Sequence, residues 1–425
     1  MIELDDVAES HEGMGLDLGG PLRLLPDPEP QQTWCPVISV DDHAFEPATL
    51  FDRVPARYRD AAPRMIEVDG LPMWEIGSQR FPLLGLDGAA GRPIEQVFAS
   101  GMRLDQYRAG VYDVNARVLD MDLNGIWASL NFPSVVWGFA GTTLNKLPDP
   151  DVALACVQSY NDWMLEDWCG RHRDRFVPCQ LPYLGDPERA AAEIRRNAAR
   201  GVPSVSFSEN PYALGYPSIH SGHWDPFFAA CAETGTVINL HVGSSGKVAQ
   251  PSPDAPTVVS SALFPINGIE ALVDWVFSKV TIRFPDLKVV LSEAGISWIP
   301  MAIERLTVAY RRRKETTYWK DTDPDPLDLM RRNFWFTSIE DPSGFRALDL
   351  IGEDRVMLEA DFPHPDGSWP HSQDIFRAQL ELLPTSTIRK LCFENAAALY
   401  RHPEPPAELL RTASLFESRP GAAVR

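Results

Sequence analysis

The stretch VISVDDH, residues 37–43, shows the pattern that decides the fold. A short apolar run ends here in an acidic residue and an imidazole, Asp41 and His43. The pattern recurs further along the chain, where His241 follows TVINL, Glu293 follows LKVVLS and Asp361 follows RVMLEA. Such runs are typical of parallel strands buried on both faces, whose carboxyl ends open onto the face where ligands bind. The sequence therefore predicts that these side chains meet around one rim.

Eight apolar runs are predicted to be strands, at residues 37–40, 125–132, 175–183, 202–208, 236–242, 287–293, 333–339 and 355–361. Stretches with apolar residues at helical spacing are found at 151–168, 186–200, 225–235, 268–279, 299–313, 343–352 and 387–401. Strands that alternate with helices and number about eight indicate a (β/α)8 TIM barrel. The predicted fold class is therefore α/β, with an N-terminal arm and a long insertion after the first strand.

The two ends and one connection depart from the barrel pattern. Residues 1–33 are polar, acidic and rich in proline, so they are predicted to form an arm that is flexible or wraps a partner subunit. The barrel is predicted to span 34–402, and 403–425 to form a C-terminal tail. Residues 44–120 are too many for an ordinary βα loop and are predicted to cap the catalytic face. Within them, the DG and GS pairs of 65–81 predict a small hairpin.

The composition narrows the class of protein. With 425 residues, of which 44% are hydrophobic, the chain can bury a large core. Its formal net charge of -20 disfavours nucleic acids and anionic membranes as partners. No apolar run approaches the ~20 residues that span a bilayer, and the start lacks the features of a signal peptide, so a cytoplasmic location is predicted. The six cysteines show no zinc-type spacing and are expected to be reduced.

Six sequence blocks carry a resemblance to a known family. They are SVDDHAFEP at 39–47, FSENP at 207–211, NLHVGSSG at 239–246, LSEAGISWIP at 291–300, EADFPHPDGSWP at 359–370 and ENAAALY at 394–400. In this order they resemble the amidohydrolase superfamily. Within it, the chain is similar to the amidohydrolase-related (amidohydrolase-2) group that includes aminocarboxymuconate-semialdehyde decarboxylase and dihydroxybenzoate decarboxylase. The resemblance implies a barrel enzyme that binds a divalent metal ion.

The resemblance also implies which residues form the metal site. Asp41, His43, His241 and Asp361 would supply a mixed nitrogen and oxygen set that suits zinc, manganese or iron. Asp361 would in addition accept a proton from a metal-activated water. Two positions depart from the group's pattern. Asp41 stands where histidine or glutamate is usual, and Glu293 stands where the decarboxylases usually have a histidine that helps protonate the substrate.

Glu293 has two interpretations. It is either a general acid or base beside the metal, or a ligand of a second metal together with Glu209, which ends the fourth strand. His364, just past the last strand, is a further catalytic candidate. Three arginines in or near the insertion are candidates for binding a substrate carboxylate: Arg103, Arg108 and Arg117.

Three functions are consistent with this site. The leading one is a metal-dependent hydrolase or carboxy-lyase that acts on a small organic acid or cyclic compound, by metal-activated water or by non-oxidative decarboxylation. The second is a dinuclear non-haem iron or iron-manganese monooxygenase that uses Glu209 and Glu293 as extra ligands. The third is a catalytically silent structural subunit that supports a paralogue in a hetero-oligomer. A small-molecule substrate and a homodimer or higher oligomer are expected.

Overall fold

Short parallel strands form the centre of the protein. The computed structural model describes residues 23–93, 96–97, 100–317 and 319–417. The strands are β1 (Val37–His43), β5 (Ile126–Phe132), β6 (Phe176–Val177), β7 (Cys179–Gln180), β8 (Ser204–Phe207), β9 (Val237–His241), β10 (Val289–Ser292), β11 (Phe334–Ser338) and β12 (Val356–Leu358). Their hydrogen-bonded order is β1-β5-β6 and β7-β8-β9-β10-β11-β12, with every neighbouring pair parallel.

The two sheets are parts of one barrel. β6 and β7 are separated only by Pro178, which has no backbone N–H to donate to a ladder. The strand predicted at 175–183 is therefore one strand that proline interrupts. At the other seam, the amide of Asp361 donates to the carbonyl of Asp41 at 2.8 Å, and the amide of His43 donates to the carbonyl of Phe362 at 2.6 Å. These hydrogen bonds join the segment that follows β12 to β1, and the predicted barrel is confirmed.

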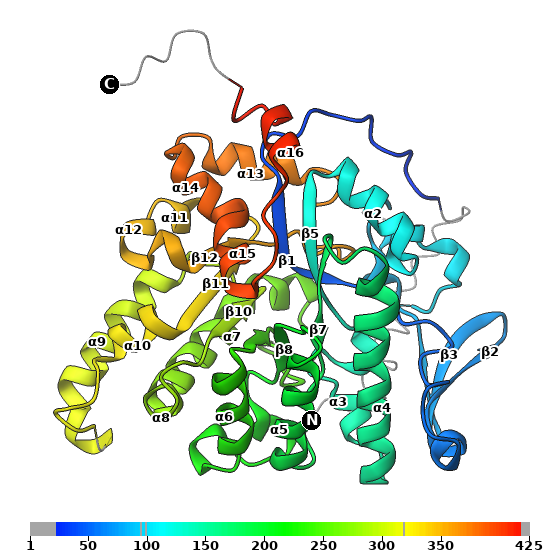
Figure 1. Cartoon of the computed structure of the whole chain (residues 1–425), viewed down its shortest axis with the longest axis horizontal. Helices are drawn as coiled ribbons and strands as arrows, with labels where there is room; N and C mark the ends of the chain where they lie inside the picture. The colour runs from blue at the N-terminus through cyan, green and yellow to red at the C-terminus, as the bar shows by residue number, and fades with distance from the viewer. Residues whose placement is uncertain (1–22, 94–95, 98–99, 318, 418–425) are drawn as a thin grey trace.

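Helices surround the strands, as Figure 1 shows. The longer ones are α2 (Val114–Leu123), α4 (Pro150–Trp163), α5 (Pro187–Ala198), α6 (Asp225–Thr234), α7 (Thr257–Phe277), α9 (Ile299–Arg313), α10 (Pro326–Asn333) and α13 (Ser372–Leu380). The shorter α-helices are α3 (Thr142–Asn145), α8 (Val280–Arg283), α11 (Pro342–Phe345), α12 (Leu348–Ile351), α14 (Thr385–Arg389), α15 (Asn395–Tyr400) and α16 (Ala407–Thr412). Asp-Pro pairs begin several helices: Asp149, Asp186 and Asp325 each accept a hydrogen bond from a first-turn amide.

Single 3-10 or π turns complete the connections. They are η1 (Ala56–Ala61), η2 (Gly85–Gly88), η4 (Leu104–Gln106), η5 (Ala109–Val111), η6 (Val135–Trp137), η7 (Met164–Trp168), η8 (Cys169–Arg171), η9 (Pro211–Leu214), η10 (Ile219–Ser221), η11 (Lys314–Thr317), η12 (Glu353–Arg355) and η13 (Lys390–Glu394). Of these, η7 and η13 are π-helical. The π turn η13 divides the helix predicted at 387–401 into α14 and α15.

Other helix boundaries also differ from the sequence prediction. The helix predicted at 268–279 begins at Thr257, even though Pro265 lies inside it. The stretch predicted at 343–352 forms two short helices, α11 and α12. The pattern predicts no helix at α10 or α13, which are only 8 and 9 residues long and so repeat the helical period barely twice. α16 lies in the predicted C-terminal tail.

The insertion after β1 contains a small antiparallel sheet. Its strands are β2 (Arg64–Val68), β3 (Leu71–Ile76) and β4 (Gln79–Pro82), so the predicted hairpin is confirmed and has a third strand. The β2–β3 turn has positive φ angles at Asp69 and Gly70, 52° and 79°, as a tight two-residue turn requires. Trp74 of β3 is fully buried and packs against Trp137, with ring centroids 4.9 Å apart. The sheet is therefore attached to the barrel through the loop after β5.

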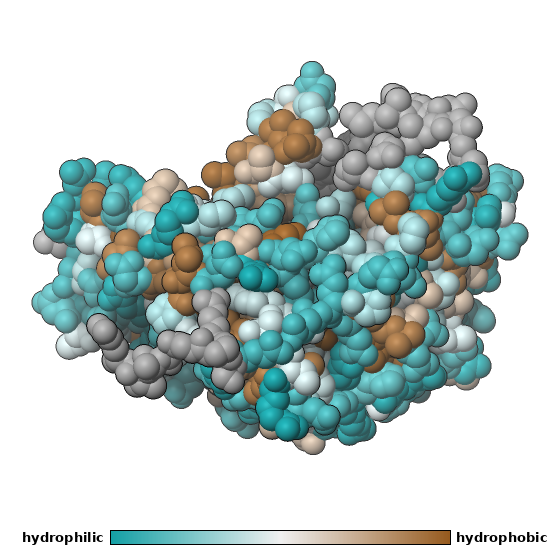
Figure 2. All heavy atoms as spheres, turned by 90° about the horizontal axis from the view of Figure 1, so that it is seen from above, coloured by the Kyte–Doolittle hydropathy of each residue, from teal (hydrophilic) through white to brown (hydrophobic). Residues whose placement is uncertain are grey.

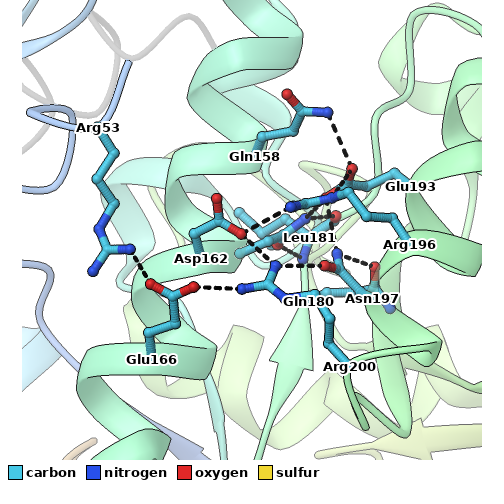
Figure 3. Close-up of polar contacts among 11 residues, drawn as sticks. Arg53, Gln158, Asp162, Glu166, Gln180, Leu181, Glu193, Arg196, Asn197 and Arg200 are labelled. Carbon is cyan, nitrogen blue, oxygen red and sulfur yellow. Dashed lines mark hydrogen bonds and ion pairs between the residues drawn. The ribbon is translucent and has the colours of Figure 1, made fainter. Parts of the chain in front are cut away.

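An ion-pair network ties the start of the insertion to the barrel helices (Figure 3). Arg53 pairs with Glu166 and, at 2.7 Å, with Asp167, both in the π turn η7. Glu166 also pairs with Arg200 at 2.7 Å, just beyond α5. Arg196 of α5 continues the network. The insertion is thus fixed to the outer helical layer at one point of ionic contact.

The described part of the chain begins and ends at exposed residues, Arg23 and Glu417. The described part of the predicted arm contacts the insertion near Leu25, whose amide donates to the carbonyl of Gly91 at 2.7 Å. It also contacts the C-terminal segment at Gln32, whose side chain donates to the carbonyl of Thr412 at 3.0 Å. Residues 1–22 lie outside the described part. The face seen from above is mostly hydrophilic, with apolar side chains in small separate groups (Figure 2). Among the described residues, no helix is long and apolar enough to cross a membrane.

Candidate metal centre

β1 directs alternate side chains into the barrel. Because successive side chains of a strand point to opposite faces, Asp41 and His43 share one face and Asp42 has the other. Asp42 accepts a hydrogen bond from the Phe362 amide at 2.8 Å and another from the Ser129 hydroxyl. Burial raises the pKa of Asp42 to about 6. Asp42 therefore links β1 to adjacent segments of the barrel, while Asp41 and His43 face the rim.

Asp41, His43, His241 and Asp361 meet at that rim. The Nε2 atom of His43 lies 3.5 Å from an oxygen of Asp41 and 3.5 Å from an oxygen of Asp361. The Nε2 atom of His241 lies 3.3 Å from the same Asp41 oxygen. All four side chains are at most 1% exposed. The structure thus brings together four residues that the sequence predicts as metal ligands.

Backbone hydrogen bonds fix how both imidazoles face this point. Nδ1 of His43 lies 3.0 Å from the carbonyl oxygen of Pro133, and Nδ1 of His241 lies 2.7 Å from that of Val242. A carbonyl can only accept, so each Nδ1 carries a proton, and in the neutral form of each ring Nε2 presents a lone pair. Burial also lowers the pKa of His43 well below its usual value. Both imidazoles therefore direct Nε2 toward the point where a metal ion would bind.

The atoms that face this point have no hydrogen-bond partner among the described residues. They are both carboxylate oxygens of Asp41, Oδ2 of Asp361, and Nε2 of His43 and His241. An unpaired buried polar group costs about 1–3 kcal/mol, and a buried carboxylate without a counter-charge costs more. A divalent cation would be a partner for these atoms, and the donor set suits manganese or zinc. The residues therefore fit the metal ion that the sequence blocks imply.

Two residues at the site have a strained backbone. Glu293 and Asp361 have φ angles of 62° and 50°, in the left-handed region that residues other than glycine rarely adopt. They follow the C-terminal ends of β10 and β12 in the chain. Strain of this kind costs on the order of 1–3 kcal/mol per residue and is typical of functional sites. It supports a role for both side chains in binding or chemistry.

Glu293 lies beside the ligand cluster. Its Oε2 atom is 3.5 Å from Nδ1 of His241, and its side chain is 13% exposed. Its backbone amide donates to the Thr337 hydroxyl at 3.0 Å and to a carboxylate oxygen of Glu359 at 3.2 Å. Burial raises the pKa of Glu293 well above its usual value. A partly accessible carboxyl in this position suits general acid or base chemistry.

Glu209 is held by hydrogen bonds of its own. Its Oε1 atom accepts from the Gly243 amide at 3.2 Å, from the Ser245 hydroxyl at 2.7 Å and from the Asn267 side chain at 3.2 Å. Burial raises the pKa of Glu209 to about 7. It lines a pocket formed by the loops after β8 and β9 and by α7. The ligand-type clusters of the described residues include neither Glu209 nor Glu293, so the second metal remains a prediction.

Aromatic rings enclose the cluster. His364, predicted as a catalytic candidate, stacks on His43 with ring centroids 3.9 Å apart, and its Nδ1 lies 3.0 Å from Asp361. The ring of Phe139 lies 4.0 Å from that of His241 and 4.9 Å from that of His43. Phe139 is only partly buried. An accessible apolar ring therefore stands next to the candidate ligands.

Several buried polar residues near the rim are not among those predicted from the sequence. Glu359 is 2% exposed and lies two residues before Asp361, so the alternation of strand side chains could have identified it. Asp87, Arg92 and Tyr107 are buried polar residues of the insertion. No local pattern marks these three, because the insertion has no regular periodicity that relates its residues to the barrel rim.

The three arginines named as candidates for binding a carboxylate have other partners. Arg103 is exposed and pairs with an aspartate at 3.0 Å. Arg108 pairs with two aspartates, at 2.6 Å and 2.8 Å. Arg117 is 1% exposed and donates to the carbonyl oxygen of His43. Arg103 and Arg108 therefore already have anionic partners within the protein. Arg117 positions the end of β1.

This geometry defines a class of protein, an enzyme that holds a divalent metal ion at the carboxyl rim of a (β/α)8 barrel. The sequence profile of the Amidohydrolase family matches residues 147–402. The chain therefore belongs to this family, as the six sequence blocks predict. It is a metal-dependent enzyme of the hydrolase or carboxy-lyase class.

Several relatives are decarboxylases. A gamma-resorcylate decarboxylase from Rhodococcus jostii (strain RHA1) is 22% identical over 335 residues, which cover 72% of this chain and 92% of the relative. An amidohydrolase structure from Mycobacterium avium subsp. paratuberculosis K-10 matches with a TM-score of 0.68 and 24% identity, over 86% of this chain and 99% of that one. A dihydroxybenzoic acid decarboxylase from Polaromonas sp. JS666, solved with bound manganese, matches with a TM-score of 0.55 and 17% identity, over 90% and 99%. At these identities the structures establish the shared fold alone.

Proposed function

We propose that this protein is a metal-dependent carboxy-lyase that removes CO2 from a small aromatic carboxylic acid without an oxidant. The observation that carries the proposal is the position of Glu293, a partly exposed carboxyl 3.5 Å from His241 at the edge of the ligand cluster. The relatives that are decarboxylases of aromatic acids favour this reaction over hydrolysis.

The ligand cluster and its aromatic wall would bind and orient the substrate. Asp41, His43, His241 and Asp361 would hold a divalent ion, which supplies positive charge for a substrate oxygen and for the negative charge that develops in the reaction. Phe139, beside both imidazole rings, provides an apolar surface for a flat ring. The scissile carboxylate would then face Glu293.

Glu293 would supply the proton that replaces CO2. As the bond between the ring carbon and the carboxylate carbon breaks, the electron pair stays on the ring and CO2 leaves. Glu293 protonates that ring carbon, and solvent restores the proton on the partly exposed carboxyl. No oxidant enters this balance. The dinuclear monooxygenase needs O2, and it would also need a metal ligand in Glu209, whose Oε1 atom already accepts three hydrogen bonds.

The test is CO2 release by manganese-loaded protein from a panel of hydroxybenzoic and related aromatic acids, without O2 and in D2O. We expect one solvent deuteron on the product ring for each CO2. Glu293→Gln should lower kcat by about 100-fold or more because it removes the proton donor, while the metal content stays unchanged. Glu304→Gln, on the exposed face of α9, is the control and should leave kcat unchanged.

Other outcomes identify the alternatives. Bond cleavage by water with no CO2 would indicate a hydrolase. Turnover that consumes O2 would indicate the monooxygenase. Full activity in Glu293→Gln would contradict the role of Glu293, and a chain that turns over only with a paralogue would indicate the structural subunit.

A further inference from the structure

Three buried polar residues of the insertion form a group next to the metal cluster. Asp87, Arg92 and Tyr107 are 3%, 7% and 2% exposed. The guanidinium carbon of Arg92 lies 5.6 Å from the centre of the Tyr107 ring. That ring lies directly on the backbone of Gly88, where a Cβ atom would come within 2.2 Å of it, so Tyr107 also lies beside Asp87. Asp87 in turn interacts electrostatically with His364.

Contacts with the barrel place this group at the rim. The amide of Ala90 donates to the carbonyl of Pro363 at 2.9 Å, which ties the insertion to the loop after β12. The ring of Tyr107 packs edge-on against that of Phe45, just beyond β1, with centroids 4.9 Å apart. The group is therefore attached to the ends of the two strands that carry Asp41 and Asp361.

The donors of this group lack partners among the described residues. Nε and Nη1 of Arg92 and the hydroxyl of Tyr107 are buried and make no hydrogen bond there. Only Nη2 of Arg92 is used, in a hydrogen bond to the carbonyl of Gln106. A buried guanidinium without an anion is costly, so it calls for an anionic partner. Arg108 shows the contrast, because its guanidinium already pairs with two aspartates.

We propose that Arg92 and Tyr107 bind a second carboxylate of the substrate, which is then an aromatic dicarboxylic acid. This inference rests on the proposed function, in which one carboxylate leaves as CO2 at the metal. A carboxylate offers only acceptors, and Arg92 and the Tyr107 hydroxyl offer unused donors that match it. Asp87, which has an unpaired acceptor oxygen, would accept a hydrogen bond from a hydroxyl group of the same ring.

Binding rather than turnover tests this proposal. Manganese-loaded full-length protein is titrated calorimetrically with benzoate and with isophthalate, which present the same ring with one and with two carboxylates. We expect isophthalate to bind at least about tenfold more tightly, as a charge-assisted hydrogen bond predicts. Arg92→Met and Tyr107→Phe should each remove most of this preference and leave benzoate affinity unchanged. Arg103→Met, an exposed arginine of the same insertion, is the control and should keep the preference.

Two results would overturn the proposal: equal affinity of the wild-type protein for both probes, or a preference that survives in both variants. Tyr107→Phe removes only an unpaired hydroxyl, so the fold should tolerate it, and melting curves verify this. If Arg92→Met has a lowered melting temperature, the isophthalate preference is measured in Arg92→Lys and Tyr107→Phe instead. CO2 release is scored separately. Isophthalate binding through Arg92 without CO2 release from any acid would contradict the proposed function alone, and CO2 release without the preference would contradict this inference alone.

Discussion

At the scale of single residues, Glu46 shows how burial makes stability depend on pH. Its two oxygens accept hydrogen bonds from the amide and the hydroxyl of Ser134, at 3.0 Å and 2.6 Å. Burial nevertheless raises the pKa of Glu46 to about 7, from 4.5. A carboxyl whose pKa is raised by folding binds a proton more tightly when folded, so it destabilises the protein increasingly as pH rises from 4.5 to 7.

We therefore expect Glu46→Gln to gain stability relative to the wild type as the pH rises. The gain should be small below pH 4.5 and level off above pH 7. Its upper limit is about 3.5 kcal/mol, from about 1.4 kcal/mol per pKa unit. Urea unfolding at a series of pH values measures it. Glu67→Gln, at an exposed position of the insertion, is the control, and a constant difference for Glu46→Gln would contradict the raised pKa.

Site residues on a strand can be predicted from the sequence, whereas site residues in the insertion cannot. Asp41 and His43 are predictable because alternation along an apolar run fixes their shared face. The same rule would have reached Glu359 from Asp361. Arg92 is different, because the fold of the insertion, and no spacing in the sequence, brings it next to the rim.

At the scale of elements, strands are more predictable than helices in this chain. All eight predicted strands exist, because each is a short apolar run that the barrel buries on both faces. The first part of α7 is not predicted from the sequence, because Pro265 and the β-branched residues Val258 and Val259 have low helix propensity. Tertiary packing overrides that propensity. The position of the insertion and its hairpin can be predicted from the sequence. Its attachment to η7 through Arg53 cannot.

The attachment of the insertion gives a prediction at this scale. Arg53 and its partners Glu166 and Asp167 are 35%, 48% and 49% exposed, so replacing Arg53 should change the free energy of unfolding by less than about 1 kcal/mol. Arg53→Met should instead speed amide exchange locally, in residues 44–63, because the ionic contact that fixes them to η7 is lost. Hydrogen exchange with mass spectrometry measures this.

The control is Arg64→Met, which removes an ion pair with Glu75 inside the small sheet and leaves the contact with η7 intact. Exchange in residues 44–63 should then match the wild type. If Arg53→Met left exchange there unchanged, apolar packing such as that of Trp74 on Trp137 would be sufficient to fix the insertion.

At the scale of the whole molecule, the metal ion should be part of the stability of the fold. The chain carries a formal net charge of -20, and the rim buries Asp41 and Asp361 with the partly exposed Glu293 beside them. Without a cation these carboxylates repel one another, and burial with the charge of Asp361 raises the pKa of Asp41 well above its usual value. A bound divalent ion would offset this repulsion and hold β1, β9 and β12 together.

Metal removal should therefore lower the melting temperature. A ligand present at 100 times its Kd stabilises the folded state by about 2.7 kcal/mol, which corresponds to several degrees for a protein of this size. Calorimetry in buffers of fixed free manganese, with and without a chelator, measures the shift. In Asp41→Asn the shift should be abolished, because the amide no longer attracts the ion, while the metal-free variant should melt no lower than the metal-free wild type, since a buried charge is gone. A wild-type melting temperature that does not depend on manganese or zinc would contradict a metal site formed by Asp41, His43, His241 and Asp361.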